Sequence, residues 1–338
     1  MTTSKFKSID LVDEEIILID QTKLPLEESY IKTDNYDRIA IAIERLEVRG
    51  APAIGISAAY AIALSFKSIS ENITVHFEKV YSRLLKTRPT AVNLFWALER
   101  MKNTFEKNRN SENIFKELLN EAKLIHEEDI LMCDKIARNG LQIFNKKSTV
   151  LTHCNTGQLA TGGSGTAFNV IKYGFEKGKV KFVYADETRP LLQGSRLTAF
   201  ELHKSGIPFS INTDSTAAFL MQISQIDLVI TGADRIAING DSANKIGTYN
   251  LAVLCNYHKI PFYIAAPTST IDKNCETGKN IKIEFRNKME INSFKNEKIT
   301  SDEYDCFSPA FDVTPNELIS GIITEKKLHL PPYDFNKI

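Results

Sequence analysis

The sequence is poor in the features that mark secreted, membrane-spanning and disulfide-bonded proteins. It has only five cysteines, an odd number without a C-x-x-C pair, which argues against a disulfide framework or zinc knuckle and favours a reducing compartment. The first fifteen residues lack the apolar core of a secretion signal. The apolar run at residues 51–66 is 16 residues long, short of the ~20 that a membrane-spanning helix needs, and predicts a buried helix. A cytoplasmic protein is therefore expected.

A surplus of charge is also missing, because 42 Lys and Arg balance 42 Asp and Glu. Non-specific binding of nucleic acid or anionic lipid needs a basic surplus or patch, so we expect neither a nucleic-acid nor a membrane partner. An acidic small molecule stays open as a ligand, since one or two arginines suffice for a phosphate. With 43% hydrophobic and 25% charged residues, the chain has the composition of a folded protein, and its 338 residues predict two domains.

Motifs for metals and nucleotide cofactors are missing as well. No H-x-x-x-H, H-E-x-x-H, G-x-S-x-G or P-loop pattern occurs, so we expect no dedicated metal site. The glycine-rich stretch at residues 162–165 precedes Asp186 by the distance expected of a ribose-binding aspartate. Its third glycine position is Phe168, however, and the glycines lie well past the preceding strand, so we expect no nicotinamide or other cofactor.

The two parts of the chain differ in their patterns. Residues 1–145 predict a mainly helical domain with a short strand at 15–19, whereas residues 146–338 alternate short apolar strands with helices. Such runs are typical of a parallel sheet covered on both faces, which predicts a doubly wound α/β domain. The strands are expected at 149–152, 180–185, 208–212, 227–231 and 261–265. The helices are expected at 36–47, 53–69, 75–86, 91–107, 111–144, 167–177, 191–204 and 249–258.

Polar residues follow four of the expected strands. They are His153, Cys154 and Asn155 after the first, Asp186, Glu187 and Arg189 after the second, Asp214 after the third and Asp234 after the fourth. The carboxyl ends of parallel strands line the ligand crevice of an open α/β sheet. This agreement across separate strands predicts an enzyme or ligand-binding site at that edge.

Cys154 is open to two interpretations. It is a buried core cysteine, or it is a reactive thiol if the turn at residues 155–157 begins a helix, because a helix N-terminus lowers a thiol pKa. His153 is its neighbour, but adjacent side chains of an extended chain point to opposite faces. No Cys–His dyad is therefore expected.

Asp234 also has two interpretations. A carboxyl group that enters a crevice from an apolar strand is partly desolvated, which raises its pKa and suits a general acid. The alternative is an aspartate that caps the next helix. Asp186 has the same alternative, and Arg189 is a candidate partner for its carboxylate.

Two segments of the helical part are candidate anion sites. In RGAPA at residues 49–53, proline suits the first helical turn and Gly50 lets the backbone approach a ligand beside Arg49. TRPT at residues 87–90 repeats the arrangement with Arg88, and Thr90 is a candidate cap. Each segment is equally consistent with a simple helix start. Asn244 and Lys245 follow Asp234 shortly in the sequence, and Lys245 adds a positive charge near the same strand end.

Several longer blocks together resemble the methylthioribose-1-phosphate isomerase family. They are RGAPAIG (49–55), THCN (152–155), ADETRPLLQGSRLTAFEL (185–202), GADRIAINGDSANKIGTYNLAVL (232–254), IPFYIAAPTSTID (260–272) and FDVTPNELISGIITE (311–325). The blocks occur in order over most of the chain. The resemblance implies a smaller, mainly helical N-terminal domain, a Rossmann-like α/β catalytic domain and a homodimer.

The resemblance also implies a reaction and its residues. The family converts 5-methylthioribose 1-phosphate to 5-methylthioribulose 1-phosphate in methionine salvage. Its catalytic cysteine falls on Cys154 and its proton-donating aspartate on Asp234. The substrate-binding positions fall on Arg49, Gly50, Ala51, Arg88, Gln193, Asn244 and Lys245.

The alternatives are related in sequence and fold. Gln158 stands where the family usually has a small residue, which brings forward a 5-deoxyribose 1-phosphate isomerase, and a ribose 1,5-bisphosphate isomerase is a further relative. A non-catalytic subunit of the initiation factor 2B type shares the fold. Such subunits lack the cysteine–aspartate pair, which Cys154 and Asp234 supply here, so an enzyme is favoured.

Overall fold

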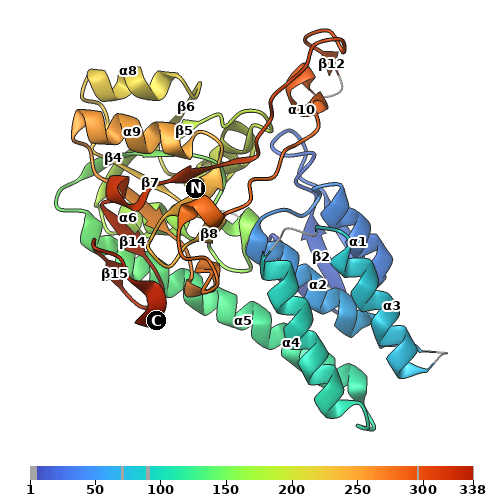
Figure 1. Ribbon diagram of the computed structural model, residues 1–338. Helices are drawn as coiled ribbons and strands as arrows, with labels where there is room; N and C mark the ends of the chain where they lie inside the picture. Colours follow the sequence, from blue (N-terminus) through green and yellow to red (C-terminus); the bar gives the residue numbers. More distant parts are fainter. Residues whose placement is uncertain (1–5, 70–71, 89–91, 295–296, 338) are drawn as a thin grey trace. The chain divides into compact units, whose positions relative to one another are not determined.

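The computed structural model describes residues 6–69, 72–88, 92–294 and 297–337 (Figure 1). The chain divides into two units: Met1–Asp134 with Thr156–Gly165 form the first, and Lys135–Asn155 with Thr166–Ile338 form the second. The chain therefore returns briefly to the first unit directly after Asn155. Among the described residues, no helix has the length and apolar character to cross a membrane.

The first unit combines a small sheet with helices. Its strands β1 (Ile9–Val12), β2 (Glu15–Ile19) and β3 (Tyr30–Thr33) pair antiparallel in that order. Its helices are α1 (Tyr36–Glu44), α2 (Ala51–Ser65), α3 (Ile73–Leu85), α4 (Val92–Asn108) and the first part of α5 (Ile114–Gly140). Only β2 was expected among these strands. The expected helices are present with small shifts of their ends, and the expected first residue of α4, residue 91, lies outside the described residues.

The apolar run of the sequence forms the centre of this unit. Every residue of α2 from Ala53 to Leu64 is buried, as expected of a helix that is apolar on all sides. Asparagines begin two of the neighbouring helices. The side chain of Asn35 accepts bonds from the first turn of α1, and that of Asn72 does the same for α3.

The second unit is built on a seven-stranded sheet, which confirms the expected doubly wound α/β fold. The strand order is β15-β14-β10-β7-β4-β5-β6, with β15 (Leu328–His329) antiparallel at one edge. The parallel strands are β4 (Ser148–Thr152), β5 (Val180–Asp186), β6 (Phe209–Asn212), β7 (Leu228–Thr231), β10 (Phe262–Ala265) and β14 (Gly321–Ile323). All five expected strands are among them.

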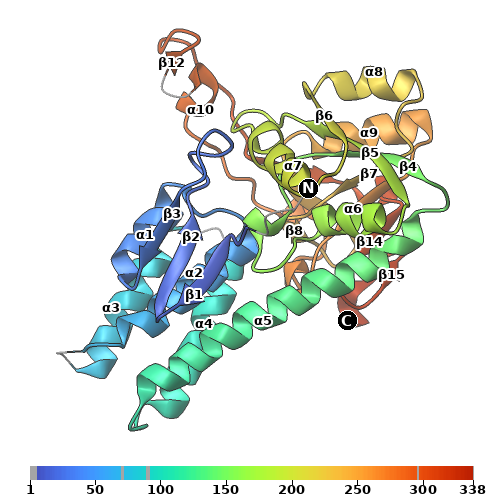
Figure 2. The same cartoon turned by 180° about the vertical axis from the view of Figure 1, so that it is seen from behind.

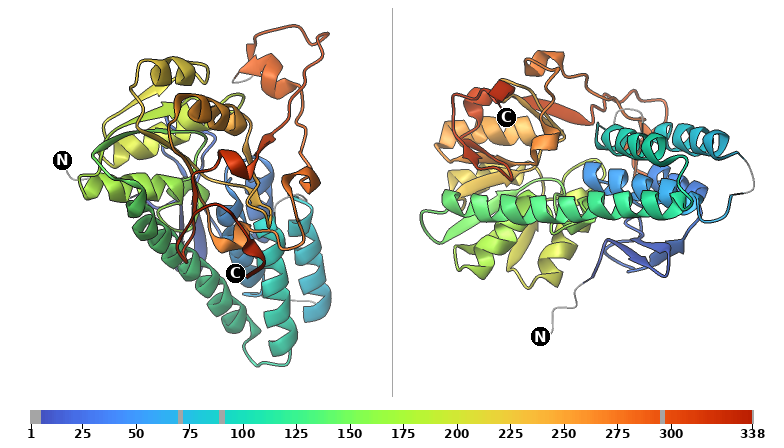
Figure 3. Two further views of the ribbon diagram at one scale, coloured as in Figure 1. Left: turned by 60° about the vertical axis from the view of Figure 1, so that its left-hand side comes forward. Right: turned by 90° about the horizontal axis from the view of Figure 1, so that it is seen from below.

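Helices cover both faces of this sheet. Successive residues of a strand point to opposite faces, and here both sets of side chains are apolar and buried against helices. Val150 belongs to a hydrophobic core cluster that includes residues of α6 (Ala167–Glu176). Leu151 belongs to a second hydrophobic core cluster that includes residues of α8 (Thr216–Gln222) and α9 (Thr248–His258). Figures 1 and 2 show α8 and α9 on one face and α6 with α7 (Ala199–Lys204) on the other. The end of α5 joins the α6 side, and α5 is one continuous helix across residues 134 and 135 (Figure 3).

The strand order reverses direction at β4. The chain goes from β4 outward to β5 and β6, and then returns to place β7 on the other side of β4. Ligands of open α/β sheets bind beyond the carboxyl ends of the strands at such a switch point. Cys154 follows β4 and Asp234 follows β7, so both come from strands that flank the switch point.

Smaller elements complete the second unit. A second sheet has the order β13 (Phe311–Thr314), β9 (Ser242–Lys245), β8 (Arg235–Ile236). The short helix α10 (Met289–Asn292) leads into a hairpin of β11 (Ser293–Phe294) and β12 (Glu297–Lys298). The β9 strand carries Asn244 and Lys245.

Candidate functional site

Cys154 lies buried at the end of β4 in an unusual backbone conformation. The residue is only 7% exposed, and its backbone φ angle is +64°. Its backbone N–H donates to Oγ1 of Thr188 at 2.8 Å, and its carbonyl accepts from Oγ1 of Thr198 at 2.6 Å. A positive φ in a residue other than glycine stores strain, and such residues cluster at functional sites. Both interpretations of Cys154 are consistent with its burial.

The surroundings of Cys154 differ from those expected in one respect. The turn after it leads into a three-residue 3₁₀ helix at Gln158–Ala160. The expected helix N-terminus at residues 155–157 is therefore wrong, because a single 3₁₀ turn lacks the aligned peptide dipoles of an α-helix. The fixed backbone of Cys154 is a feature that the sequence pattern does not show.

The loop after β5 supports Cys154 through Thr188. Thr188 has a φ of +65°, and its hydroxyl donates to the carbonyl of Asp186 at 3.0 Å. The backbone N–H groups of Thr188 and Arg189 each donate to a different carboxylate oxygen of Asp214 at 2.7 Å. Asp214 therefore fixes the loop that holds the backbone of Cys154.

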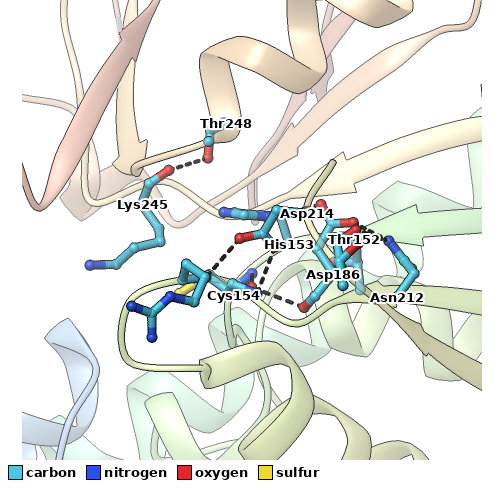
Figure 4. A network of polar contacts seen from close by, with 12 residues as sticks. Thr152, His153, Cys154, Asp186, Asn212, Asp214, Lys245 and Thr248 are labelled. Atoms are coloured by element: carbon cyan, nitrogen blue, oxygen red, sulfur yellow. Dashed lines mark hydrogen bonds and ion pairs between the residues drawn. The ribbon is translucent and has the colours of Figure 1, made fainter. Parts of the chain in front are cut away.

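Asp186 binds His153, and the expected pairing with Arg189 is wrong. Its Oδ2 lies 3.0 Å from Nδ1 of His153, and its Oδ1 accepts from Asn212 at 2.7 Å (Figure 4). Burial raises the pKa of Asp186, although both hydrogen bonds act to lower it. Burial lowers the pKa of His153. The hydrogen bond and the charge of Asp186, the charge of Asp214 and the carbonyl of Ile246 together outweigh burial, so the pKa of His153 is raised.

The second ring nitrogen of His153 also has a partner. Nε2 lies 2.9 Å from the carbonyl oxygen of Ile246. Both nitrogens are thus bonded away from Cys154, which confirms that the two neighbours form no dyad. Among the described residues, His153, Asp186 and Asp214 have candidate metal-ligand atoms within 4.8 Å of one another. The hydrogen bonds just described account for this group without a metal ion.

A π-helical turn, η3 (Gly194–Thr198), follows the loop after β5. It replaces the first half of the helix expected at 191–204, and π turns are frequent at functional sites. Gly194 permits the turn, because a Cβ there would lie 1.6 Å from the carbonyl oxygen of Asp186. Gln193, directly before it, is 4% exposed, and its buried Oε1 has no hydrogen-bond donor among the described residues.

The end of β9 places Asn244 and Lys245 in a buried position. They are 4% and 6% exposed. The amide of Asn244 donates to Oγ1 of Thr248 at 3.0 Å, and that hydroxyl donates to the carbonyl of Lys245 at 2.7 Å. Nζ of Lys245 lies 4.9 Å from the ring centre of Phe311, a cation–π contact. Lys245 is buried, and the next residue, Ile246, contacts His153 at the carboxyl end of β4. A lysine in this position is suited to bind an anion.

Asp234 is exposed, on the short connection between β7 and β8. The expectation that the protein itself desolvates this carboxyl group is therefore wrong. The alternative of a helix cap is also wrong, because the strand β8 follows and no helix begins there. The backbone N–H of Asp234 donates to the carbonyl of Ala243 at 2.9 Å, which links the residue to β9.

The remaining predicted residues lie in the first unit. Gly50 precedes α2 with a φ of +95°, and Pro52 is in the first turn, as expected. A Cβ on Gly50 would lie 2.4 Å from Cα of Ala160, so this glycine permits a close backbone contact. Arg49 and Arg88 are half-buried, and Thr90 lies outside the described residues. Cys154, Gln193, Asp234, Asn244 and Lys245 belong to the second unit.

Sequence reasoning missed the anchoring of residues 156–165 in the first unit. Oδ2 of Asp129 accepts from the N–H groups of Gly162 and Gly163 at 2.7 and 3.3 Å. Asp129 is buried, and burial raises the pKa of its carboxyl group to about 6. Gln158 donates to the carbonyl of Phe6 at 2.6 Å. An acidic residue on the buried side of a helix was the only available signal for Asp129.

Comparisons with known proteins show which family the chain is similar to. Residues 47–329 match the Initiation factor 2 subunit family. The chain is 51% identical to a methylthioribose-1-phosphate isomerase of Caldicellulosiruptor saccharolyticus, over 98% of each chain. It is 50% identical to one of Carboxydothermus hydrogenoformans, over 96% of each.

Two solved structures extend the comparison. The 5-methylthioribose 1-phosphate isomerase from Pyrococcus horikoshii OT3 has a TM-score of 0.92 at 39% identity, covering 98% of this chain and 97% of its own. A structure described as translation initiation factor eIF-2B, subunit delta, from A. fulgidus has a TM-score of 0.89 at 41% identity, covering 97% of both. The chain therefore belongs to the methylthioribose-1-phosphate isomerases of the initiation factor 2 subunit family.

Proposed function

We propose that the chain is an aldose–ketose isomerase that converts 5-methylthioribose 1-phosphate to 5-methylthioribulose 1-phosphate in methionine salvage. The relatives that are 51% and 50% identical over nearly the whole chain carry that enzyme's name. The observation that carries the proposal at the level of the site is the strained, buried Cys154 beyond β4, next to the strand that leads to Asp234. In this proposal the second unit is the catalytic domain and the first unit is the N-terminal domain. The expected division into residues 1–145 and 146–338 differs from these units at residues 135–145 and 156–165.

The proposed mechanism begins with ring opening. The phosphate on O1 keeps the sugar cyclic, so an acid must protonate the ring oxygen as its bond to C1 breaks. C1 is then an electron-poor oxocarbenium carbon that still carries the phosphate. Asp234 donates this proton. Because its side chain is exposed in the chain itself, the bound sugar must cover the carboxyl group for that role, which is a form of water exclusion on binding.

The second stage moves hydrogen from C2 to C1 of the open sugar. C1 gains the hydrogen and becomes the methylene that carries the phosphate, while the C2 hydroxyl loses its proton and becomes the ketone. That proton replaces the one that Asp234 gave to the ring oxygen, so no external oxidant or reductant is consumed. Cys154 lies beside the reacting carbons and handles or shields the migrating hydrogen. Its bonded backbone holds the thiol in one position, which favours a reaction that depends on alignment.

In this proposal, positively charged side chains and hydrogen-bonding groups together bind the substrate. Lys245 and the arginines Arg49 and Arg88 are suited to the phosphate. The free acceptor on Gln193 is suited to a sugar hydroxyl, because an unpaired buried acceptor is otherwise costly. Further contacts are assigned to Asn244 and to the backbone of Gly50 and Ala51.

We also propose that the chain acts in the cytoplasm as a homodimer. Large apolar side chains are exposed on α8 and α9, which pack against each other, directly after α8 and on β6. They are Phe219, Tyr249, Val253, Tyr257, Ile223 and Ile211. Exposed aromatic and aliphatic side chains on a pair of packed helices make these helices a candidate interface. Light scattering is expected to give a dimer mass, and replacing Phe219 with Asp should shift it toward the monomer. A monomeric wild type would contradict the proposal.

Proton NMR of substrate mixtures tests the proposed activity and its specificity. The purified chain is incubated with 5-methylthioribose 1-phosphate, 5-deoxyribose 1-phosphate or ribose 1,5-bisphosphate. We expect the anomeric signal of the methylthio sugar to disappear fastest as the C1 methylene signal of the ketose grows. Faster turnover of another sugar would change the assigned substrate. No turnover of any of them would favour the non-catalytic alternative, which the similarity to the structure described as subunit delta keeps relevant.

A further inference from the structure

His153 connects three parts of the second unit directly behind Cys154. It is 1% exposed and precedes the cysteine in the chain. On one side its ring meets Asp186 at the end of β5, and on the other it meets the carbonyl of Ile246. Ile246 directly follows Lys245 at the end of β9. The ring thus links the cysteine to the strand end that carries Lys245.

The partners of the ring define its protonation. The carbonyl oxygen of Ile246 only accepts hydrogen bonds, so Nε2 must carry a proton. Nδ1 lies 3.0 Å from Oδ2 of Asp186. With this carboxyl group ionised, Oδ2 can only accept, so Nδ1 donates as well. An imidazole that donates from both nitrogens is an imidazolium. Asp186, Asp214 and Asp312 are the acidic groups around it, and together they favour its positive charge.

The backbone opposite the ring is shaped to receive it. Gly247 has a φ of +103°, and a Cβ there would lie 2.9 Å from Cε1 and 3.0 Å from Nε2 of His153. The N–H of Gly247 donates to Asp312 at 2.7 Å. The glycine is therefore required both by its own conformation and by the space that the ring occupies.

We propose that His153 is a positioning residue of the isomerase: its imidazolium, bonded between Asp186 and the carbonyl of Ile246, fixes Cys154 relative to Asn244 and Lys245. The inference rests on the proposed function and deepens it. His153 touches neither the substrate nor the reacting atoms. It acts by keeping the thiol and the anion-binding strand end in one arrangement, and a misplacement of that arrangement reduces the rate of the chemical step.

Two substitutions of Asp186 separate this role from simple packing. Asp186→Ala removes the partner of Nδ1, so the ring loses its orientation. Asp186→Asn rebuilds the bonds in neutral form: its amide donates to Nδ1, while Nε2 still donates to Ile246. We expect kcat to fall about tenfold or more in the alanine variant, with KM changed less than about threefold, and to recover in part in the asparagine variant.

Asp227→Ala is the matched control. The carboxylate of Asp227 accepts a hydrogen bond from the backbone N–H of Thr149 at 2.7 Å. Asp227 therefore anchors the start of β4, the strand whose other end leads into His153 and Cys154. The control is expected to lower thermal stability as Asp186→Ala does, and to leave kcat unchanged. Wild-type kcat in Asp186→Ala would overturn the proposal, as would an equal loss of kcat in the control. If Asp186→Ala does not fold, the comparison is made with Asp186→Asn.

Nitrogen NMR of the protein labelled with ¹⁵N-histidine supplies a readout that is independent of activity. We expect both ring nitrogens of His153 to be protonated at the pH of the isomerase assay in the wild type, and only Nε2 in Asp186→Asn. An unprotonated ring nitrogen in the wild type would overturn the proposal. Inactivity of the wild type on every sugar phosphate would instead show that the proposed function has failed, whatever the state of this ring.

Discussion

The backbone N–H of Cys154 donates to the hydroxyl of Thr188 at 2.8 Å, and both residues have positive φ angles, +64° and +65°. Two strained residues from different strand ends are thus joined directly. Thr188 is 0% exposed, so water does not replace its hydroxyl. The strain at Cys154 is maintained by the surrounding bonds, as expected where a fold holds a functional group in place.

Replacing Thr188 with Val tests this relationship. Valine has the shape of threonine but no acceptor, so the buried N–H of Cys154 loses its partner, at a cost of about 1–3 kcal/mol. We expect a lower free energy of unfolding by that amount and a reduced kcat, measured by urea denaturation and by the isomerase assay. Thr188→Ser keeps the hydroxyl and should stay close to the wild type. Equal stability and activity in all three proteins would show that the bond is unimportant.

Replacing Gln193 with Leu separates binding from stability. The buried Oε1 of Gln193 has no donor among the described residues, so its removal should not lower the free energy of unfolding. If this oxygen binds a sugar hydroxyl, kcat/KM should fall about tenfold, equal to ~1.4 kcal/mol. The measurement pairs urea denaturation with steady-state kinetics. A stable variant with unchanged kcat/KM would remove Gln193 from the substrate site.

The buried Asp129 predicts a pH dependence of stability. Burial raises its pKa from 3.8 to about 6 in the folded chain. Between these values the folded state keeps a proton that the unfolded state has released, so stability falls as the pH rises through this window. Asp129→Asn does not titrate. From pH 5 to 7.5, the wild type should lose about 1 kcal/mol relative to this variant.

Urea denaturation of both proteins at the two pH values measures this difference. The comparison cancels the other titrating groups, because they are the same in both chains. A pH-independent difference would mean that the carboxyl group of Asp129 is already ionised at pH 5. The affected contact is the one that holds Gly162 and Gly163.

The fold of the second unit could be predicted well from the sequence. Its strands are short apolar runs between helices, and residues such as Val150 and Leu151 point to opposite faces that are both covered. That pattern is local, so it can be recognised without knowing any tertiary contact. The buried helix α2 was predictable for the same reason. The polar residues at strand ends followed from the expected parallel arrangement.

The connections within the site could not be predicted in this way. The bond between His153 and Asp186 joins residues 33 positions apart, and that between Asp129 and Gly162 joins residues on different elements. Positive φ angles at Cys154 and Thr188 are imposed by tertiary contacts, and neither residue type favours them. The exposure of Asp234 depends on the course of the chain after β7, which an apolar strand pattern does not determine.

The central claim is that this chain isomerises its sugar phosphate at Cys154 and Asp234, and a proton NMR time course tests it most directly. Wild type, Cys154→Ala and Asp234→Asn are compared on 5-methylthioribose 1-phosphate, after thermal denaturation has confirmed that all three fold. We predict conversion to the ketose by the wild type and a loss of at least about a hundredfold in each variant. Conversion by either variant at the wild-type rate would contradict the role assigned to that residue.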